Sequence, residues 1–182
     1  MNVITHFYKN DGTETDMDNC DYCRIELKGP NAKKIDAHML ISKHTIGLVS
    51  CYEWYLGKDG YPVSYRCIDT KQNLGHGIRI HRLLMEDPKG MVVDHINNNK
   101  LDNRMNNLRI CTAKENSYNT KKRTNNYKGV KKISKDSYSA IISKDGKTRE
   151  IKNIPTAKQA AQIYDMMAEE LFGVFAGKNY IA

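Results

Sequence analysis

Asp94, His95, Asn107 and Asn116 have the side chains that phosphodiester hydrolysis by one metal ion requires. A hard divalent cation prefers oxygen ligands, which the Asp94 carboxylate and the Asn116 amide can supply while positions remain for water and phosphate. The adjacent His95 is the only common side chain whose unperturbed pKa lets it take a proton from water near neutral pH. The metal ion offsets the charge that builds on the transferring phosphate. We therefore expect one Mg²⁺ or Mn²⁺ ion per site, with His95 as the general base.

A β-hairpin followed by a helix would position these four side chains. Two apolar runs, 91–93 and 108–111, bracket a loop rich in Asn, Asp and Lys, which predicts strand, loop and strand. Thr112 can cap a following helix, with Glu115 as its capping-box partner. If the helix folds back over the first strand, Asp94, His95 and Asn116 meet. Asn107 can brace the loop through side-chain to backbone hydrogen bonds, and Asn103 is a second candidate for that role.

The ordered set resembles the HNH nuclease motif, in the His-Asn-Asn variety of phage and intron-encoded homing endonucleases. Its three positions are His95, Asn107 and Asn116, and the resemblance extends over residues 52–120, through a Trp-Tyr hairpin, a His-Arg-Leu-Leu-Met segment and Pro-Lys-Gly. It implies a metal-dependent DNA endonuclease with a ββα-metal (His-Me finger) hairpin, in which Asp94 and Asn116 hold the ion and Asn107 is structural. Two alternatives stay open: His81 and Arg82 either touch the DNA backbone or begin a helix, and the hairpin could be an inactive copy inside a DNA-binding regulator.

Charge is distributed unevenly along the 182 residues, which are enough for one or two small domains. Residues 121–182 carry 13 Lys and Arg against 6 Asp and Glu, whereas residues 1–120 carry 16 against 15, so the last third accounts for most of the net charge of +8. A basic surface of this kind either binds phosphates or is simply solvated. No apolar run long enough for a membrane span and no signal segment is visible, which predicts a cytoplasmic protein, in an infected host cell if the phage resemblance holds.

Five cysteines include one Cys-x-x-C pair, Cys20 and Cys23, without a second close pair. A structural zinc site normally needs both pairs, so we expect none. Residues 1–75 alternate like short strands and predict a β-rich extension, except that residues 35–50 have roughly helical spacing. The expected divisions are this extension, the nuclease hairpin over 76–119, a basic linker over 120–126 and a last domain over 127–182.

The last domain is predicted as three antiparallel strands packed on one amphipathic helix, which makes the whole chain α+β. The strands are expected over 127–133, 137–143 and 148–154, with an Asp-Gly hairpin turn, and the helix over 157–172. Side chains alternate between the two faces of a strand, so the helix covers one face of the sheet and leaves the other free. The free face is expected to carry cations and small hydroxyls, as in proteins that read DNA with a β-sheet. The residues expected to contact double-stranded DNA are Arg109, Lys121, Lys122, Arg123, Lys131, Lys132, Ser139, Ser143, Lys144, Arg149 and Lys152.

Residues 126–179 resemble the plant ethylene-response-factor (Apetala) type of DNA-binding domain. Tyr127-Lys128-Gly129-Val130 and the run 156–165 carry the match, although Tyr138 stands where a tryptophan is usual. Ile133, Ser143 and Glu150 also replace arginines or a tryptophan. The resemblance implies the fold and general DNA binding.

One nuclease hairpin holds one active site, so a monomer would nick DNA and a weak dimer could cut both strands.

Overall fold

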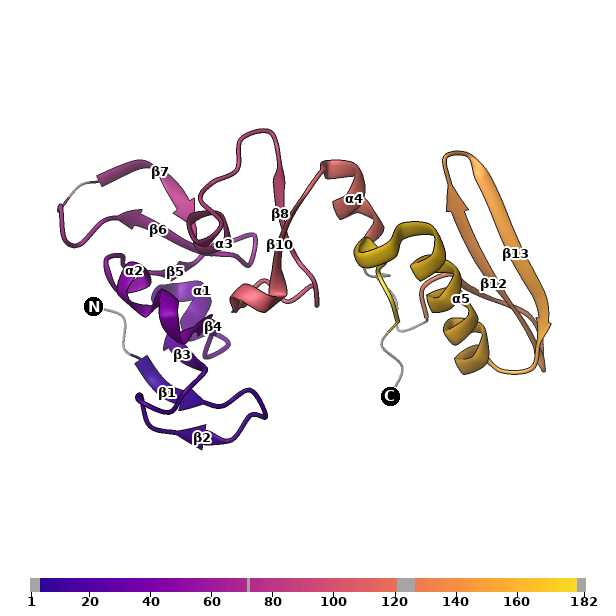
Figure 1. Ribbon diagram of the computed structural model, residues 1–182, viewed down its shortest axis with the longest axis horizontal. Coiled ribbons are helices and arrows are strands. Elements are labelled where there is room, and N and C mark those ends of the chain that lie inside the picture. Colours follow the sequence, from indigo (N-terminus) through magenta and orange to yellow (C-terminus); the bar gives the residue numbers. More distant parts are fainter. Residues whose placement is uncertain (1–3, 72, 121–126, 180–182) are drawn as a thin grey trace. The chain divides into compact units, whose positions relative to one another are not determined.

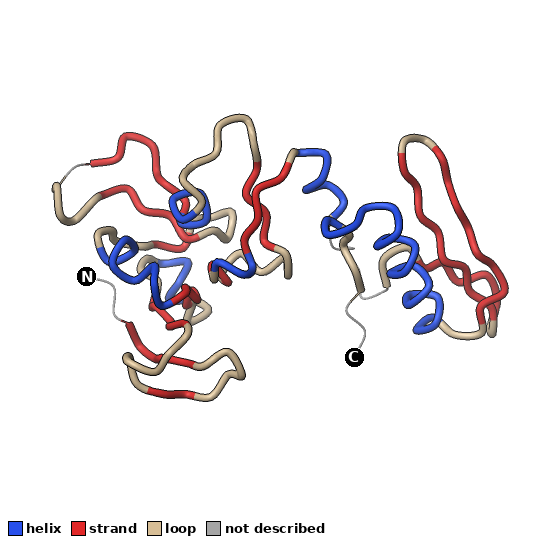
Figure 2. The backbone as a smooth tube through the Cα atoms, in the orientation of Figure 1, coloured by secondary structure: helices blue, strands red, loops and turns tan. Residues whose placement is uncertain are grey.

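The structure is a computed structural model that describes residues 4–71, 73–120 and 127–179. It is a mixed α+β protein with several small sheets and few helices, as Figure 2 shows. The chain divides into two compact units, residues 1–111 and 112–182, which we describe separately. This division differs from the predicted boundaries at 75, 119 and 126. The predicted linker contacts Lys121, Lys122 and Arg123 lie outside the described residues. Within those residues, no helix combines the length and the apolar character needed to cross a bilayer.

The largest sheet of the N-terminal unit joins the N-terminal extension to the loop that follows His95. Its strand order is β2-β1-β3-β4-β9. The strands are β1 (Ile4–Tyr8), β2 (Glu14–Thr15), β3 (Tyr22–Glu26), β4 (His38–Ser42) and β9 (Asp102–Asn103). Strand β9 pairs in parallel with β4, so that Leu40 lies beside Asp102 and Ile41 beside Asn103. The extension is therefore part of the framework that holds this loop.

The helical spacing predicted for residues 35–50 is wrong in its first half. Residues 38–42 form strand β4, and a 3-10 turn η1 (Lys43–Thr45) and helix α2 (Ile46–Ser50) follow it. Within β4, Met39 and Ile41 are fully buried, whereas His38, Leu40 and Ser42 are half-buried. This alternation by twos is the burial pattern of a strand, and it was hidden because Leu40 is also apolar.

A three-stranded sheet, β5-β6-β7, and short helices also belong to this unit (Figure 1). The remaining elements before the predicted site are α1 (Pro30–Lys33), β5 (Tyr55–Leu56), β6 (Pro62–Arg66), β7 (Asn73–Arg79) and α3 (Ile80–Leu84). Trp54 is fully buried among apolar residues of both sheets, and its indole donates to the Val49 carbonyl oxygen at 2.9 Å. The two sheets and the helices thus share one core, which Trp54 anchors.

The predicted hairpin is present as β8 (Val92–His95) and β10 (Leu108–Cys111), with a 3-10 turn η2 (Met105–Asn107) before the second strand. The strands are antiparallel, and their register sets Arg109 opposite Asp94 and Leu108 opposite His95. Asp94 and His95 are the last two residues of β8, as the apolar pattern predicted.

The C-terminal unit begins with helix α4 (Ala113–Tyr118), where the capping box of Thr112 and Glu115 is confirmed. It continues with β11 (Val130–Ser134), β12 (Ser137–Lys144), β13 (Lys147–Ile154), α5 (Ala157–Phe172) and η3 (Gly173–Phe175). Figure 1 shows β12 and β13 as a long hairpin alongside α5. Asp145 and Gly146 both have positive φ angles, of 51° and 79°, which fits the predicted tight turn. The first strand begins three residues later than predicted, and helix α5 has the predicted bounds.

Helix α4 is fastened to the rest of this unit. The ring of Tyr118 stacks on that of Phe172 with centroids 4.1 Å apart. The Tyr118 carbonyl oxygen accepts hydrogen bonds from Lys128 Nζ at 2.7 Å and from the Gly177 amide at 3.1 Å. These contacts come from Lys128, which precedes β11, and from residues at and after the end of α5. Helix α4 is therefore packed against the sheet and α5.

One residue expected on the free face of the sheet is not available there. Ser139 is 0% exposed, and its hydroxyl has no hydrogen-bond partner within the described residues. It lies on the central strand beside a register shift between Tyr138 and Ala140, where Asn153 of β13 has a φ of 60°. A short side chain on a central strand is covered by longer neighbours, and the irregularity was not visible in the sequence. Ser139 is therefore corrected from a DNA contact to a buried residue.

Candidate active site

Asp94 and His95 are both buried, with 8% and 4% of their surfaces exposed. Arg109, the cross-strand neighbour of Asp94, donates to Asp94 Oδ2 from Nε at 2.9 Å and from Nη2 at 2.6 Å. The sequence predicted that Arg109 contacts DNA. In the structure its guanidinium is turned to Asp94 and is largely buried, so the pair neutralises a carboxylate that would otherwise be costly to bury.

The hydrogen bond between His95 Nε2 and Asn103 Oδ1 fixes the protonation pattern of the His95 ring. Asn103 Nδ2 donates to the Lys100 carbonyl oxygen at 3.2 Å, which defines the orientation of the Asn103 amide. Its Oδ1 therefore lies 3.1 Å from His95 Nε2, and an amide oxygen only accepts hydrogen bonds. The hydrogen of the neutral ring must lie on Nε2, which leaves the lone pair on Nδ1. Asn103 is fully buried on β9, where the pairing with β4 holds it.

Burial dominates the proton affinity of His95. Removal from water lowers the pKa of its imidazole, while the hydrogen bond to Asn103 and the nearby Asp94 and Asp102 carboxylates oppose that shift. The net effect keeps His95 neutral at neutral pH. A neutral imidazole is the form that can accept a proton from water.

Asn107 braces the loop between the two strands. Its Oδ1 accepts from the Asn97 amide at 3.0 Å, and its Nδ2 donates to Asn97 Oδ1 at 3.0 Å and to the Asp102 carbonyl oxygen at 2.7 Å. Arg104 adds two bonds of 2.7 Å to the Asp102 carboxylate, and these hold the pKa of Asp102 below its usual range although burial alone would raise it. The two asparagines that the sequence could not rank thus have different partners: Asn107 contacts the loop and Asn103 contacts His95.

Two rings lie next to His95: Tyr61, which was not identified as a site residue from the sequence, and His81, which was considered for the site only as a possible contact to the DNA backbone. The rings of Tyr61 and His81 lie 5.9 Å and 5.1 Å from that of His95, centroid to centroid, and 4.8 Å from each other. His81 lies in the first turn of α3, as one of the two alternatives predicted, but it is buried, with 5% of its surface exposed. Arg82 donates to the Asp87 carboxylate and to the Pro88 carbonyl oxygen, so it closes the turn after α3. The apolar neighbours of His81 were the one available signal of its burial.

The buried His81 makes the stability of the protein sensitive to acid. Burial, followed by the charge of His95, lowers the pKa of His81 from 6.5 to about 3. Below pH 6.5 the unfolded chain binds a proton that the folded protein excludes, so stability falls as pH falls toward 3. We expect the free energy of unfolding of His81→Phe to rise relative to that of the wild type by about 1.4 kcal/mol for each pH unit by which the pH is lowered from 5.5 to 4. Urea denaturation of both proteins checks this, and a stability difference that does not change with pH would contradict it.

Asn116 lies in α4, in the C-terminal unit. Its backbone amide donates to the Thr112 carbonyl oxygen within the helix. Because the two units are described separately, its convergence with Asp94 stays a prediction. Within the described residues, no group of three or more His, Cys, Asp or Glu side chains is placed to hold a metal ion. A donor set of one carboxylate and one amide oxygen fits Mg²⁺ or Mn²⁺ by type, since these ions keep several waters. Burial raises the pKa of the Cys23 thiol to about 12, which does not favour thiolate ligation.

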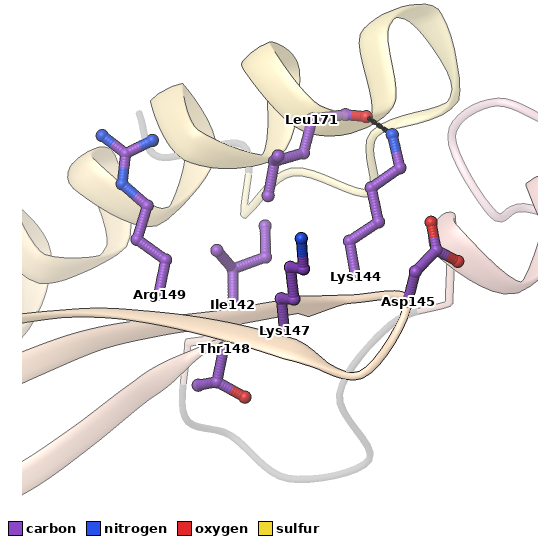
Figure 3. A pocket seen from close by; sticks show the side chains of 7 residues that line it. All are labelled: Ile142, Lys144, Asp145, Lys147, Thr148, Arg149 and Leu171. Carbon is purple, nitrogen blue, oxygen red and sulfur yellow. Dashed lines mark hydrogen bonds between the residues drawn. The ribbon is translucent and has the colours of Figure 1, made fainter.

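The cations of the C-terminal sheet are divided between its two faces. Lys131 and Lys132 are exposed on β11, and Lys152 lies 3.5 Å from Glu150 on β13. Lys144 and Arg149 instead lie on the side of α5, and Lys144 donates to the Leu171 carbonyl oxygen (Figure 3). Arg149 pairs with Glu170 of α5. Lys144 and Arg149 line a cavity of about 310 Å³, while Thr148 points to the opposite side, as Figure 3 shows. Lys144 and Arg149 are therefore not on the free face that was expected to read DNA.

Comparison with known proteins agrees with this local arrangement. Residues 86–118, which span the hairpin and α4, match the family model described as HNH endonuclease. A protein of Acanthamoeba polyphaga mimivirus named as an HNH endonuclease is 52% identical over 140 residues, which are 74% of this chain and 70% of that protein. Protein 3.8 of Escherichia phage T7 is 33% identical over 93 residues, 49% of this chain and 76% of its own length. A Bacillus subtilis protein named as a prophage-derived HNH homing endonuclease is 28% identical over 111 residues, 61% of this chain and 55% of that protein. No solved structure matches the chain.

The chain belongs to the HNH endonuclease family. Membership implies a nuclease whose substrate is DNA, and HNH nucleases generally use a divalent metal ion. The residues that would act in this chain, and the role of its C-terminal unit, are matters of proposal.

Proposed function

We propose that this protein is a metal-dependent homing endonuclease that hydrolyses a phosphodiester of double-stranded DNA, with His95 as the general base. The observation that carries the proposal is the bond between His95 Nε2 and Asn103 Oδ1, because it leaves the Nδ1 lone pair as the proton acceptor of a buried, neutral ring. A general base needs this combination of a fixed tautomer and a neutral form at working pH.

Asp94 and Asn116 are the proposed ligands of a Mg²⁺ or Mn²⁺ ion, one per site, in a ββα-metal arrangement of β8, β10 and α4. When bound, such an ion supplies positive charge to the transferring phosphate and to the leaving oxygen. Asn107 keeps the loop 96–107 in shape, and Asn103 keeps the His95 ring oriented. His95 Nδ1 takes the proton of the attacking water. Arg109 neutralises the Asp94 carboxylate and orients it through Oδ2.

We further propose that residues 127–182 are a DNA-binding domain of the ethylene-response-factor type. Three antiparallel strands packed on α5 support this, together with the exposed cations of β11. In this role the domain locates the target, and the nuclease residues within 76–119 and α4 cut or nick it. The viral and prophage relatives support action in the cytoplasm of an infected cell.

Incubation of the purified protein with supercoiled plasmid tests the activity. With Mg²⁺ we expect conversion to nicked circles, and with EDTA in its place we expect none, because the ion offsets charge in the transition state. Asp94→Asn keeps the size of the side chain and should retard DNA on a gel without cutting it. If the wild type also retards DNA but never cuts it with any divalent ion, the protein is a DNA-binding regulator with an inactive hairpin.

Lys131 tests the recognition face of the C-terminal unit. It is exposed on β11 opposite Ser139, and each phosphate contact releases about one counterion. We expect Lys131→Ala to weaken DNA binding and to reduce the slope of log Kd against log salt by about one. Lys34→Ala, which removes an exposed cation after α1, is the matched control. Equal slopes for the two variants would place the recognition face elsewhere.

A further inference from the structure

Three rings from separate elements meet at the end of β8. Tyr61 follows the turn between β5 and β6, His81 lies in the first turn of α3, and His95 ends β8. The rings of His81 and His95 meet edge to face, with an interplanar angle of 66° and centroids 5.1 Å apart. Tyr61 is tilted by 43° and 42° against the two imidazoles. Such geometries are the favourable ones for aromatic pairs.

The hydrogen bond that His95 Nε2 donates to Asn103 Oδ1 does not by itself hold the His95 ring. It constrains one atom, Nε2, whereas rotation of a histidine ring about its Cβ–Cγ bond has broad, roughly two-fold preferences. A ring that turned over would lose this hydrogen bond and present a carbon atom where Nδ1 is needed, but one hydrogen bond opposes that rotation by only about 1 kcal/mol. Further packing against the ring is therefore required to keep Nδ1 directed at one place.

Tyr61 is itself held in place by charged groups. Lys100 Nζ lies 4.4 Å from the centre of the Tyr61 ring and donates to the Asp59 carbonyl oxygen at 2.8 Å. Arg79 lies 5.4 Å from the same ring centre and pairs with the Asp59 carboxylate at 2.7 Å. These contacts connect the turn of the β5–β6 hairpin to the loop that follows His95.

His81 is held by packing. It is 5% exposed, and its Nδ1 has no hydrogen-bond partner in the part of the chain that the structure describes. Its low pKa keeps it uncharged at neutral pH. An uncharged ring without a polar partner for its buried nitrogen contributes its shape to this site.

We propose that Tyr61 and His81 are positioning residues for His95, which they hold as two ring walls while Asn103 holds Nε2. The inference rests on the proposed role of His95 as the general base. It assigns a function in catalysis to the β5–β6 hairpin and to α3, which contribute none of the proposed metal ligands.

Ring-deleting and ring-keeping variants test this proposal. Tyr61→Leu and His81→Leu keep apolar bulk but lose the planar ring, whereas Tyr61→Phe and His81→Phe keep it. We expect the leucine variants to lower kcat for plasmid nicking by about 10-fold or more with KM within about two-fold, because a base that is misdirected still allows DNA to bind. The phenylalanine variants should recover kcat to within about three-fold of wild type. Tyr8→Ala removes a ring stacked on Tyr22 in the N-terminal sheet and should leave kcat unchanged.

Nitrogen NMR of ¹⁵N-histidine-labelled protein gives a readout that does not need cleavage. The His95 signals, assigned with His95→Ala, should show one tautomer with the hydrogen on Nε2 in the wild type and a mixture in the leucine variants. Leucine variants with wild-type kcat and one tautomer would overturn the proposal. Phenylalanine variants that are about 10-fold or more slower than wild type would also overturn it, since a polar atom would then be responsible. This comparison with wild type decides even if a leucine variant fails to fold. If His95→Ala cuts as fast as wild type, the proposed general base is wrong, and the NMR result still decides whether the walls hold the ring.

Discussion

Replacing His95 by alanine will lower kcat for metal-dependent nicking by about 10²–10⁴-fold, the contribution that a positioned general base makes. His95 is a buried, neutral ring whose tautomer is set by Asn103, so the loss of Nδ1 removes the proton acceptor and little else. DNA retardation should be retained, because the exposed cations proposed to bind DNA belong to the C-terminal unit, which this substitution leaves unchanged. The measurement is single-turnover nicking of supercoiled plasmid with Mg²⁺.

His44→Ala provides the control for this experiment. His44 is exposed in η1 and contributes no contact to the ring cluster around His95, so its loss should leave the rate unchanged. A rate for His95→Ala within about three-fold of wild type would exclude general-base catalysis by this residue.

Gly129→Ala will destabilise the C-terminal unit by about 3–5 kcal/mol, through the combination of backbone strain and overpacking. Gly129 has a φ of 70°, and a Cβ atom there would lie 1.9 Å from Cδ2 of the Tyr164 ring and 2.8 Å from the Ile141 carbonyl oxygen. Tyr164 is buried in the core of this unit, so its ring cannot move aside without opening a cavity. Thermal or urea unfolding of the full chain measures the loss.

Gly146→Ala separates the two causes of that loss. Gly146 also has a positive φ, of 79°, but a Cβ atom there would meet nothing within 4 Å. This variant should therefore cost only the backbone strain, about 1–2 kcal/mol. Equal losses for the two variants would show that the contact with Tyr164 is unimportant.

Features encoded within a few residues could be predicted from the sequence. The capping box of Thr112, the Asp-Gly turn and the bounds of α5 all depend on side chains that act on neighbouring backbone, and each is confirmed. The hairpin of β8 and β10 was equally visible, because two apolar runs flank one polar loop. Local chemistry was thus sufficient wherever the interacting groups were close along the chain.

Features that depend on distant segments could not be predicted. Nothing in the pattern of residues 35–50 showed that β4 would pair with β9, some sixty residues later, and hold Asn103 there. The ring contacts of Tyr61 and His81 with His95 likewise depend on how the β5–β6 hairpin packs. The sequence could rank neither Asn103 against Asn107 nor Ser139 against its neighbours, because burial and register decide those roles.

The parallel pairing of β4 with β9 limits how far this nuclease can be shortened. The Leu40 backbone amide donates to the Leu101 carbonyl oxygen at 2.8 Å, and the Ser42 hydroxyl accepts from the Met105 backbone amide at 3.0 Å. A peptide trimmed to the stretch that family comparison highlights, residues 86–118, would leave β9 without this neighbour and Asn103 in water. Engineers who wish to graft the cutting module onto another DNA reader should therefore carry the first hundred residues with it.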